Sequence, residues 1–217
     1  MIWNLLLAHF MGDFLLQTDW IARKKENFSV LALHVAILFS LMVLFAGQFR
    51  NILWPYLLLI AATHLIQDRT KIVMTNKKRK QGVLFFFIDQ LVHVLIIIGV
   101  IFLFESLNGP LTLPESPTWA VITLVAVILT QGWFITERII FAEDNGYVES
   151  INQTKYSRMI TRVTLTGLLY LVMSWAFPSL VLFVLTPYPQ PHYRKRAMMI
   201  DLSVSVFGFL IIILASG

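Results

Sequence analysis

Residues 9–17 read His-Phe-Met-Gly-Asp-Phe-Leu-Leu-Gln, within an apolar run that extends from about Ile2 to Gln17. His9, Asp13 and Gln17 are spaced four residues apart, so at 3.6 residues per turn they form one stripe along a helix. Ionisable side chains are costly in contact with lipid and normally face the interior of a helical bundle or an aqueous cavity. The run therefore predicts a membrane helix whose polar face is turned toward other helices.

The composition points to the same class of protein. The chain has 217 residues, of which 58% are hydrophobic and only 13% charged, and its mean hydropathy is +0.75. Several runs approach the roughly 20 apolar residues that cross a bilayer as a helix. We predict an all-α, polytopic transmembrane helical bundle with about seven or eight membrane segments. The predicted segments are residues 2–17, 28–48, 52–68, 83–104, 119–141, 156–186 and 198–215, and a break near residues 175–178 divides the sixth into two.

The loops differ in charge. Residues 23–25 and 71–80 are rich in lysine and arginine, whereas residues 105–118 contain two glutamates and no basic residue. Basic loops stay in the cytoplasm, so this asymmetry predicts an N-terminus outside the cell. The same loops account for the net charge of +5, and we expect no nucleic-acid partner.

The His-x-x-x-Asp spacing of the first segment returns at His64 and Asp68, and it is reversed at Asp89 and His93. Since successive segments alternate in direction, the reversal places each carboxylate on the cytoplasmic side of its histidine. The N-terminal half thus resembles a duplicated helical hairpin, with His34 in the second segment and His93 in the fourth. We predict a four-helix membrane domain over residues 1–104, carrying a cluster between its two hairpins, followed by C-terminal membrane helices over residues 105–217.

The absence of cysteine restricts any metal to nitrogen and oxygen ligands, and imidazole with carboxylate suits a divalent transition metal such as Zn, Fe or Mn. The predicted ligands are His9, Asp13, His34, His64, Asp68, Asp89 and His93. An ion there can activate water toward an ester or phosphate, which makes Asp13, Asp68 and Asp89 candidate catalytic residues. Lys71, one heptad after His64, can hold an anionic substrate group. Gln17 and Gln90 can orient the ligands.

Plainer interpretations remain open for these residues. Each His–Asp pair can be a hydrogen bond within one helix, and the glutamines can join neighbouring helices. We interpret Glu137 and Arg138 as a salt bridge at the membrane interface. Asp201 is expected to cap its helix or to pair with Arg194 or Arg196. His192 is interpreted as a loop residue.

Together these residues resemble a known family. The sets His9-x-x-x-Asp13-Phe14-x-x-Gln17-x-Asp19-Trp20, His34, His64-x-x-x-Asp68-x-x-Lys71 and Asp89-Gln90-x-x-His93 are similar to bacterial membrane proteins of domain-of-unknown-function family 3307. The resemblance covers residues 1–104. It implies a bacterial inner (cytoplasmic) membrane protein in which these positions belong to one recurring site. A looser similarity, by analogy alone, is to membrane-embedded metal-dependent hydrolases.

The leading functional hypothesis is a metal-dependent hydrolase or transferase that acts from the cytoplasmic side on a lipid-linked or amphipathic substrate. Its expected partners are membrane lipids, with a lipid phosphate as the substrate; we make no prediction of the oligomeric state. The first alternative is a transporter or proton-coupled channel that uses the His–Asp pairs as a relay. The second is a regulatory or scaffold subunit whose buried pairs specify helix packing.

Overall fold

The computed structural model describes residues 1–75, 82–111, 118–171, 186 and 191–216. Helices make up nearly all of these residues and no strand occurs among them, which confirms the predicted all-α class. The chain divides into two compact units, residues 1–120 and 121–217, each of which is described by itself. The break predicted near residues 175–178 and the basic run of residues 77–80 lie outside the described residues.

Within the described ranges, four helical stretches are long and apolar enough to cross a membrane: Phe28–Met74, Gly82–Asn108, Thr118–Ile140 and His192–Ala215. The first stretch contains two helices, α3 (Phe28–Ala46) and α4 (Arg50–Thr75). They are joined by the short 3-10 helix η2 (Gly47–Phe49), which begins at a glycine with a φ of 56° that favours a residue without Cβ. A shorter apolar helix covers Ile2–Leu16. These lengths and compositions are those of a helical membrane protein.

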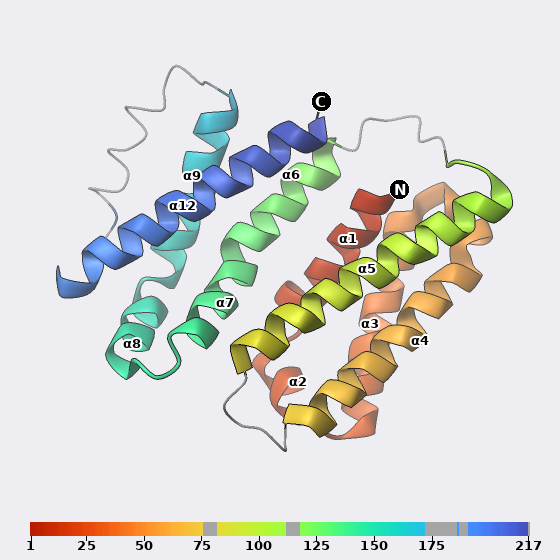
Figure 1. Cartoon of the computed structure of the whole chain (residues 1–217), viewed down its shortest axis with the longest axis horizontal. Helices are drawn as coiled ribbons and strands as arrows, with labels where there is room; N and C mark the ends of the chain where they lie inside the picture. Colours follow the sequence, from red (N-terminus) through yellow and green to blue (C-terminus); the bar gives the residue numbers. More distant parts are fainter. Residues whose placement is uncertain (76–81, 112–117, 172–185, 187–190, 217) are drawn as a thin grey trace. The chain divides into compact units, whose positions relative to one another are not determined.

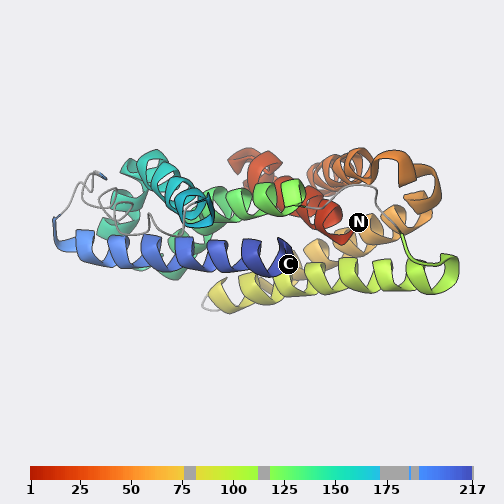
Figure 2. The ribbon, with the colours of Figure 1, turned by 90° about the horizontal axis from the view of Figure 1, so that it is seen from above.

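The long helices of the first unit pack against one another (Figure 1). Helix α1 (Ile2–Phe10), which continues as the π-helical turn η1 (Met11–Leu16), packs against α3 and α5 (Gly82–Asn108), and α4 also packs against both. Seen from above, α5 lies on the opposite side of the unit from α3 (Figure 2). The short α2 (Asp19–Lys24) packs against α3 at one end of this bundle.

The first unit has apolar side chains outside and ionisable ones inside. Ile66, Leu91 and Phe102 are 65%, 57% and 67% exposed, whereas His9 and His34 are fully buried. Water would make this arrangement unfavourable, because large apolar areas would stay solvated. Lipid around the apolar surface removes that cost, so the distribution agrees with a bundle that spans a membrane.

Gly12 allows α1 and α3 to approach closely. A Cβ at this position would lie 2.8 Å from Cδ1 of Leu38, a side chain that is itself fully buried. The glycine lies inside η1, and single π-helical turns occur frequently at functional sites. The glycine of the opening sequence therefore places Asp13 deep between the helices.

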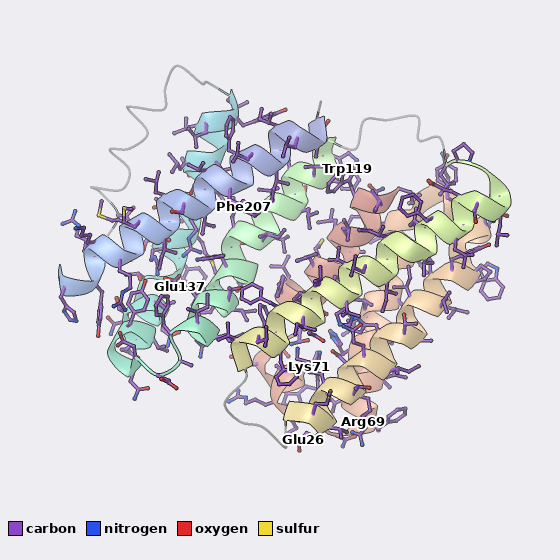
Figure 3. The ribbon with its side chains drawn as sticks, viewed as in Figure 1. Glu26, Arg69, Lys71, Trp119, Glu137 and Phe207 are labelled. Atoms are coloured by element: carbon purple, nitrogen blue, oxygen red, sulfur yellow. The ribbon has the colours of Figure 1, made fainter. Side chains whose placement is uncertain are left out.

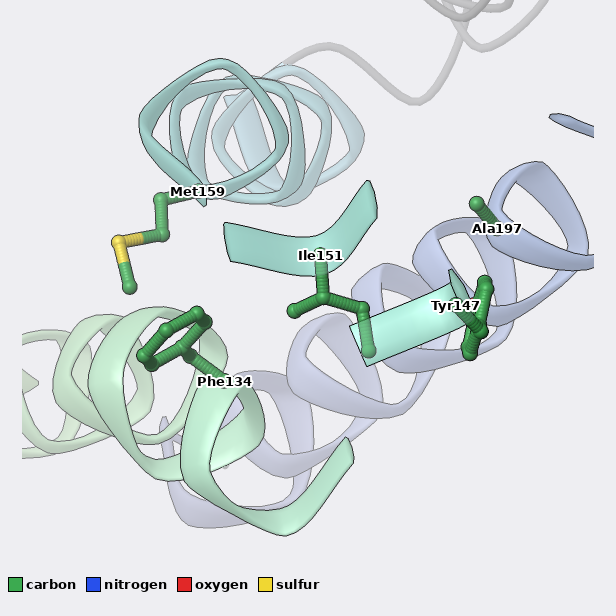
Figure 4. Packing of buried hydrophobic residues seen from close by; sticks show 5 residues of the cluster. All are labelled: Phe134, Tyr147, Ile151, Met159 and Ala197. Carbon is green, nitrogen blue, oxygen red and sulfur yellow. The ribbon is translucent and has the colours of Figure 1, made fainter. Parts of the chain in front are cut away.

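The second unit contains the end of α6 (Thr118–Val127), a π-helical turn η3 (Ile128–Gly132), α7 (Trp133–Ile140), α8 (Asn145–Gln153), α9 (Lys155–Leu171) and α12 (Pro191–Ser216). Helix α9 packs against α12 and η3. An apolar cluster fills the space beside α8 (Figure 4). Its buried members are Phe134, Tyr147, Ile151, Met159 and Ala197.

A buried ionic cluster corrects two sequence-based predictions for this unit. Glu137 is fully buried and pairs with Arg158 at 2.8 Å and Arg162 at 3.3 Å, so the predicted interfacial bridge to Arg138 is wrong. Asp201 accepts hydrogen bonds from the same two arginines, at 2.7–2.9 Å, and Arg196 donates to Asp144. The pattern missed by sequence reasoning is that Arg158 and Arg162 are one turn apart inside a predicted membrane segment. Buried charges require partners, so this spacing itself signalled a buried ionic cluster.

Candidate metal centre

Seven histidine and aspartate side chains converge inside the first unit. They come from α1 and η1, from α3, from α4 and from α5, and none is more than 7% exposed. The residues are His9, Asp13, His34, His64, Asp68, Asp89 and His93. The structure thus brings together all seven of the ligands predicted from the sequence, while their role as ligands stays a prediction.

The three pairs with i, i+4 spacing are not hydrogen-bonded within their own helices. The distances from Nε2 to the nearer carboxylate oxygen are 3.9 Å for His9–Asp13, 3.6 Å for His64–Asp68 and 3.7 Å for His93–Asp89. These values exceed the range of N–H···O hydrogen bonds, about 2.7–3.2 Å. The interpretation as three separate intrahelical bonds therefore does not account for the arrangement.

The shortest contacts within the set run between helices. His34 Nε2 lies 3.3 Å from His64 Nε2 and 3.2 Å from Asp13 Oδ1. Asp68 lies between two histidines, with Oδ2 at 3.6 Å from His64 Nε2 and Oδ1 at 3.8 Å from His93 Nε2. The rings of His64 and His93 are stacked with centroids 4.1 Å apart. Antiparallel α4 and α5 thus hold their motifs at one level, as the reversed spacing in α5 predicted.

Several ligand atoms in the cluster have no hydrogen-bond partner among the described residues. They include Nε2 of His9 and Nε2 of His93, both on residues that are at least nine-tenths buried. Asp13 Oδ1, by contrast, lies 3.2 Å from His34 Nε2. A buried polar atom without a partner costs about 1–3 kcal/mol, so these atoms are suited to bind an ion or a polar group.

Two lysines bind carboxylates of the cluster. Lys25 Nζ donates to Asp68 Oδ2 at 2.7 Å, and Lys71 Nζ donates to Asp89 Oδ2 at 2.5 Å. Lys71, on α4, lies at the end of the unit where Glu26 and Arg69 also lie (Figure 3). The side chain of Lys71 is 34% exposed and that of Lys25 is 14% exposed. These lysines mark the side of the cluster that is nearest to the surface of the unit.

The glutamines near the cluster differ in their contacts. Gln90 donates to Asp13 Oδ2 at 3.4 Å, and Gln67 donates to the backbone oxygen of Asp89 at 2.8 Å. The side chain of Gln17 makes no hydrogen bond with any residue that the structure describes. Gln67 and Lys25 were not singled out from the sequence. Gln67 follows His64 by three residues and shares its helix face, whereas Lys25 resembled an ordinary basic linker residue and carried no further signal.

The cluster contains three groups of residues whose ligand atoms lie within 4.8 Å of one another: His9, Asp13 and His64; His34, His64 and Asp68; and Asp68, Asp89 and His93. An ion with nitrogen and oxygen ligands at about 2.0–2.1 Å holds tetrahedral ligand atoms about 3.3–3.4 Å apart. The Nε2 atoms of His34 and His64 lie 3.3 Å apart, and each lies 3.2 to 3.8 Å from an oxygen of Asp13 and from an oxygen of Asp68. These distances are close to those between the ligand atoms of a divalent ion.

The comparisons with known proteins agree with the resemblance stated for residues 1–104. No curated protein and no solved structure is detectably similar to the chain. The match to a family covers the whole of the His/Asp cluster and more than half of the sequence. The chain belongs to the family described as "Protein of unknown function (DUF3307)", whose sequence model matches residues 1–122.

Proposed function

We propose that this protein is a membrane-embedded metal enzyme, a hydrolase or transferase that acts on a lipid-linked or amphipathic substrate. The observation that carries the proposal is the convergence of buried imidazole nitrogens and carboxylate oxygens. His34 Nε2 faces His64 Nε2 at 3.3 Å with carboxylate oxygens of Asp13 and Asp68 beside them. Two imidazole nitrogens this close are favourable when a shared proton or a metal ion lies between them.

The composition of the set favours a divalent transition metal, and Zn, Fe and Mn are the candidates. Three aspartates in a buried site repel one another, and a bound cation removes that cost. The ion supplies Lewis acidity toward an ester or phosphate oxygen and activates water near neutral pH. Gln90 donates to Asp13 Oδ2, and Gln67 donates to Asp89 Oδ1 as well as to its backbone oxygen, so the two glutamines hold two of the carboxylates in position.

The substrate is proposed to enter from the cytoplasmic leaflet of a bacterial inner membrane. Lys25 and Lys71 lie on the side of the cluster nearest to the surface of the unit, and both belong to sequence regions whose basic residues predict a cytoplasmic location. Surface lysines attract anionic headgroups. The chain around the site is apolar on its outside, so an amphipathic substrate can remain in lipid while its polar group enters.

The transporter alternative requires ionisable groups that connect both faces of the membrane. In residues 1–120 as described, the buried ionisable side chains are the seven members of the cluster, which lie together at one level. This gathering favours a one-sided site over a relay. The opposite conclusion would follow if metal-free protein in proteoliposomes carried a flux that His64→Ala abolishes. That result would favour a transporter over an enzyme.

The proposal is tested on the full chain, purified in dodecyl maltoside without chelator. We expect about one or more equivalents of a transition metal by mass spectrometry, and hydrolysis of fluorescent lipid esters or lipid phosphates that stops on chelation and returns with metal. Asp68→Asn should abolish both signals, whereas Asp144→Asn, outside the cluster, should leave them intact. Less than about a tenth of an equivalent of metal in the wild type would overturn the proposal.

A further inference from the structure

We propose that the cluster is a two-cation site bridged by Asp68, in which binding of the second cation is coupled to binding of a phosphate group. This inference rests on the proposed function and deepens it, because it assigns two distinct ion positions and names the class of substrate. Three features carry it. The two oxygens of Asp68 face different histidines, the two ion positions differ in their number of protein ligands, and the formal charge of the site calls for an anion when both ions are bound.

The two oxygens of Asp68 face different histidines. Oδ2 lies 3.6 Å from His64 Nε2 and 3.8 Å from His34 Nε2, whereas Oδ1 lies 3.8 Å from His93 Nε2. Asp68 accordingly belongs to two of the three groups of candidate ligands. A carboxylate that offers one oxygen to each of two neighbouring groups is suited to bridge two ions, which in such sites lie about 3.5–4 Å apart.

The first position has a full set of protein ligands. His34 and His64 lie 3.3 Å apart at Nε2, and Asp13 Oδ1 lies 3.2 Å from the first and 3.8 Å from the second. Asp68 Oδ2, which lies 3.6 Å from His64 Nε2 and 3.8 Å from His34 Nε2, is the fourth donor. A position with four protein ligands holds its ion tightly and needs no further component.

The second position has fewer ligands and is therefore open. His93 Nε2 lies 3.8 Å from Asp68 Oδ1 and 3.7 Å from Asp89 Oδ1, and it has no hydrogen-bond partner among the described residues. Three protein ligands leave a place in the coordination shell for another molecule. The other oxygen of Asp89 already binds Lys71, so this position lies beside an ammonium group.

The charges indicate what that molecule is. Lys25 leaves Asp68 Oδ2 when the first cation binds that oxygen, so three aspartates and Lys71, with the imidazoles counted as neutral ligands, give the cluster a formal charge of −2. The first divalent cation changes this charge to 0. A second changes it to +2, which is unfavourable in a low dielectric without an added anion. A phosphate dianion restores a charge of 0, and its tetrahedral oxygens can contact both ions and an ammonium group together.

The open position therefore fills readily only when a phosphate group is present. Esters and amides without a negative charge do not supply the missing anion, so the proposed substrates are phosphate esters. The phosphate can belong to a lipid headgroup or to a water-soluble compound, because the same cations and lysines recognise both.

The test is a titration of the metal-free full chain with Mn²⁺ in dodecyl maltoside micelles, followed by mass spectrometry and by electron paramagnetic resonance. Mn²⁺ alone is expected to bind with one tight equivalent. With inorganic phosphate or with phosphatidic acid at equal phosphate concentration, a second equivalent should bind at least about tenfold more tightly. Two ions bridged by one carboxylate are exchange-coupled, so the hyperfine splitting of Mn²⁺ should halve.

The two phosphate arms distinguish the source of the ligand. If only phosphatidic acid tightens binding of the second equivalent, the ligand is a lipid headgroup. If only inorganic phosphate does so, the ligand is a soluble phosphate. A second equivalent that binds equally well with and without phosphate overturns the coupling. One equivalent under every condition overturns the two-cation site but leaves the proposed function standing, whereas no bound cation removes both.

Variants assign the two positions. Asp89→Asn keeps the shape of the side chain and should abolish the second equivalent, and the exchange coupling with it, while the first is retained. His93→Gln should give the same result if Asp89→Asn does not fold. Asp144→Asn serves as the control for loss of one carboxylate elsewhere. Equal loss of both equivalents in Asp89→Asn and His93→Gln would contradict the division into two positions.

Discussion

Replacement of Lys25 by glutamine should strengthen metal binding, although it removes a residue that contacts the site. Lys25 Nζ donates to Asp68 Oδ2 at 2.7 Å. An ion on the same oxygen at about 2.1 Å would lie within about 5 Å of Nζ. At an effective dielectric constant of about 20, an ammonium at that distance from a divalent cation raises the free energy by about 7 kcal/mol. The ammonium and the ion therefore compete for Asp68.

The lysine can avoid this repulsion by swinging toward solvent, since its side chain is already 14% exposed. The penalty on metal binding is then only the loss of its hydrogen bond to Asp68, about 1.5–3 kcal/mol for a charged pair. Lys25→Gln removes that penalty. The dissociation constant of the first cation should consequently fall by about 10- to 150-fold.

The assay is competition between the metal-free protein and a chromophoric chelator in dodecyl maltoside, with Mn²⁺ or Zn²⁺. Lys24→Gln is the matched control, because it changes the net charge equally at an exposed neighbouring position. It should leave the dissociation constant within about twofold, since exposed charges are screened by salt. Weaker binding in Lys25→Gln, or an equal gain in both variants, would refute the competition and with it the assignment of Asp68 as a ligand.

Three further predictions concern the fold. Asp201→Asn leaves two buried arginines facing a single carboxylate and should lower the free energy of unfolding in detergent by about 3–5 kcal/mol. Asp144→Asn, the control, should have little effect on this free energy. A similar loss in both variants would contradict the buried ionic cluster. Gly12→Ala places a Cβ 2.8 Å from Leu38 Cδ1 and should destabilise the protein by about 1–3 kcal/mol in the same assay, whereas unchanged stability would show that the helices can separate there. The backbone N–H of Tyr147 lowers the pKa of Asp144 below its usual 3.8, so the contribution of this cap to α8 is present above about pH 4 and is lost as the pH falls through the lowered pKa. The pH dependence of the Tyr147 amide chemical shift should have a midpoint below 3.8, and a midpoint at or above that value would contradict this assignment.

The sequence predicted those features of the structure that depend on residues close to one another along the chain. Helical period and apolar length predicted the membrane helices, and the i, i+4 spacing of His9–Asp13, His64–Asp68 and Asp89–His93 predicted that each pair shares one face. The reversal in the last pair followed from the alternating direction of membrane segments. The cost of ionisable groups in lipid then implied that the faces meet inside the bundle.

Contacts between distant residues did not follow from spacing. Nothing in the linker sequence distinguishes Lys25 from its basic neighbour Lys24, yet only Lys25 contacts Asp68. The packing of α3, α4 and α5 decides which histidine each oxygen of Asp68 faces. It also brings His34 and His64 close to each other. Such details depend on side-chain packing between helices, which a periodic pattern does not specify.

In the second unit, by contrast, the spacing of two arginines was itself a local signal of the buried ionic cluster. Arg158 and Arg162 are one turn apart on α9, within a segment predicted to lie in the membrane. Two arginines on one face of such a helix need two acidic partners. Glu137 and Asp201 were noticed, but they were paired with nearer basic residues. Proximity in sequence is a poor guide to partners once the charges are buried.

The central claim is that a divalent cation lies among His34, His64, Asp13 and Asp68. The most direct measurement is a diffraction experiment on the protein purified without chelator, with data collected at the absorption edge of the metal that copurifies. The account predicts an anomalous peak about 2.0–2.2 Å from Nε2 of both histidines. No peak there, with His34 and His64 joined by a direct hydrogen bond and the carboxylates held only by lysines, would contradict it.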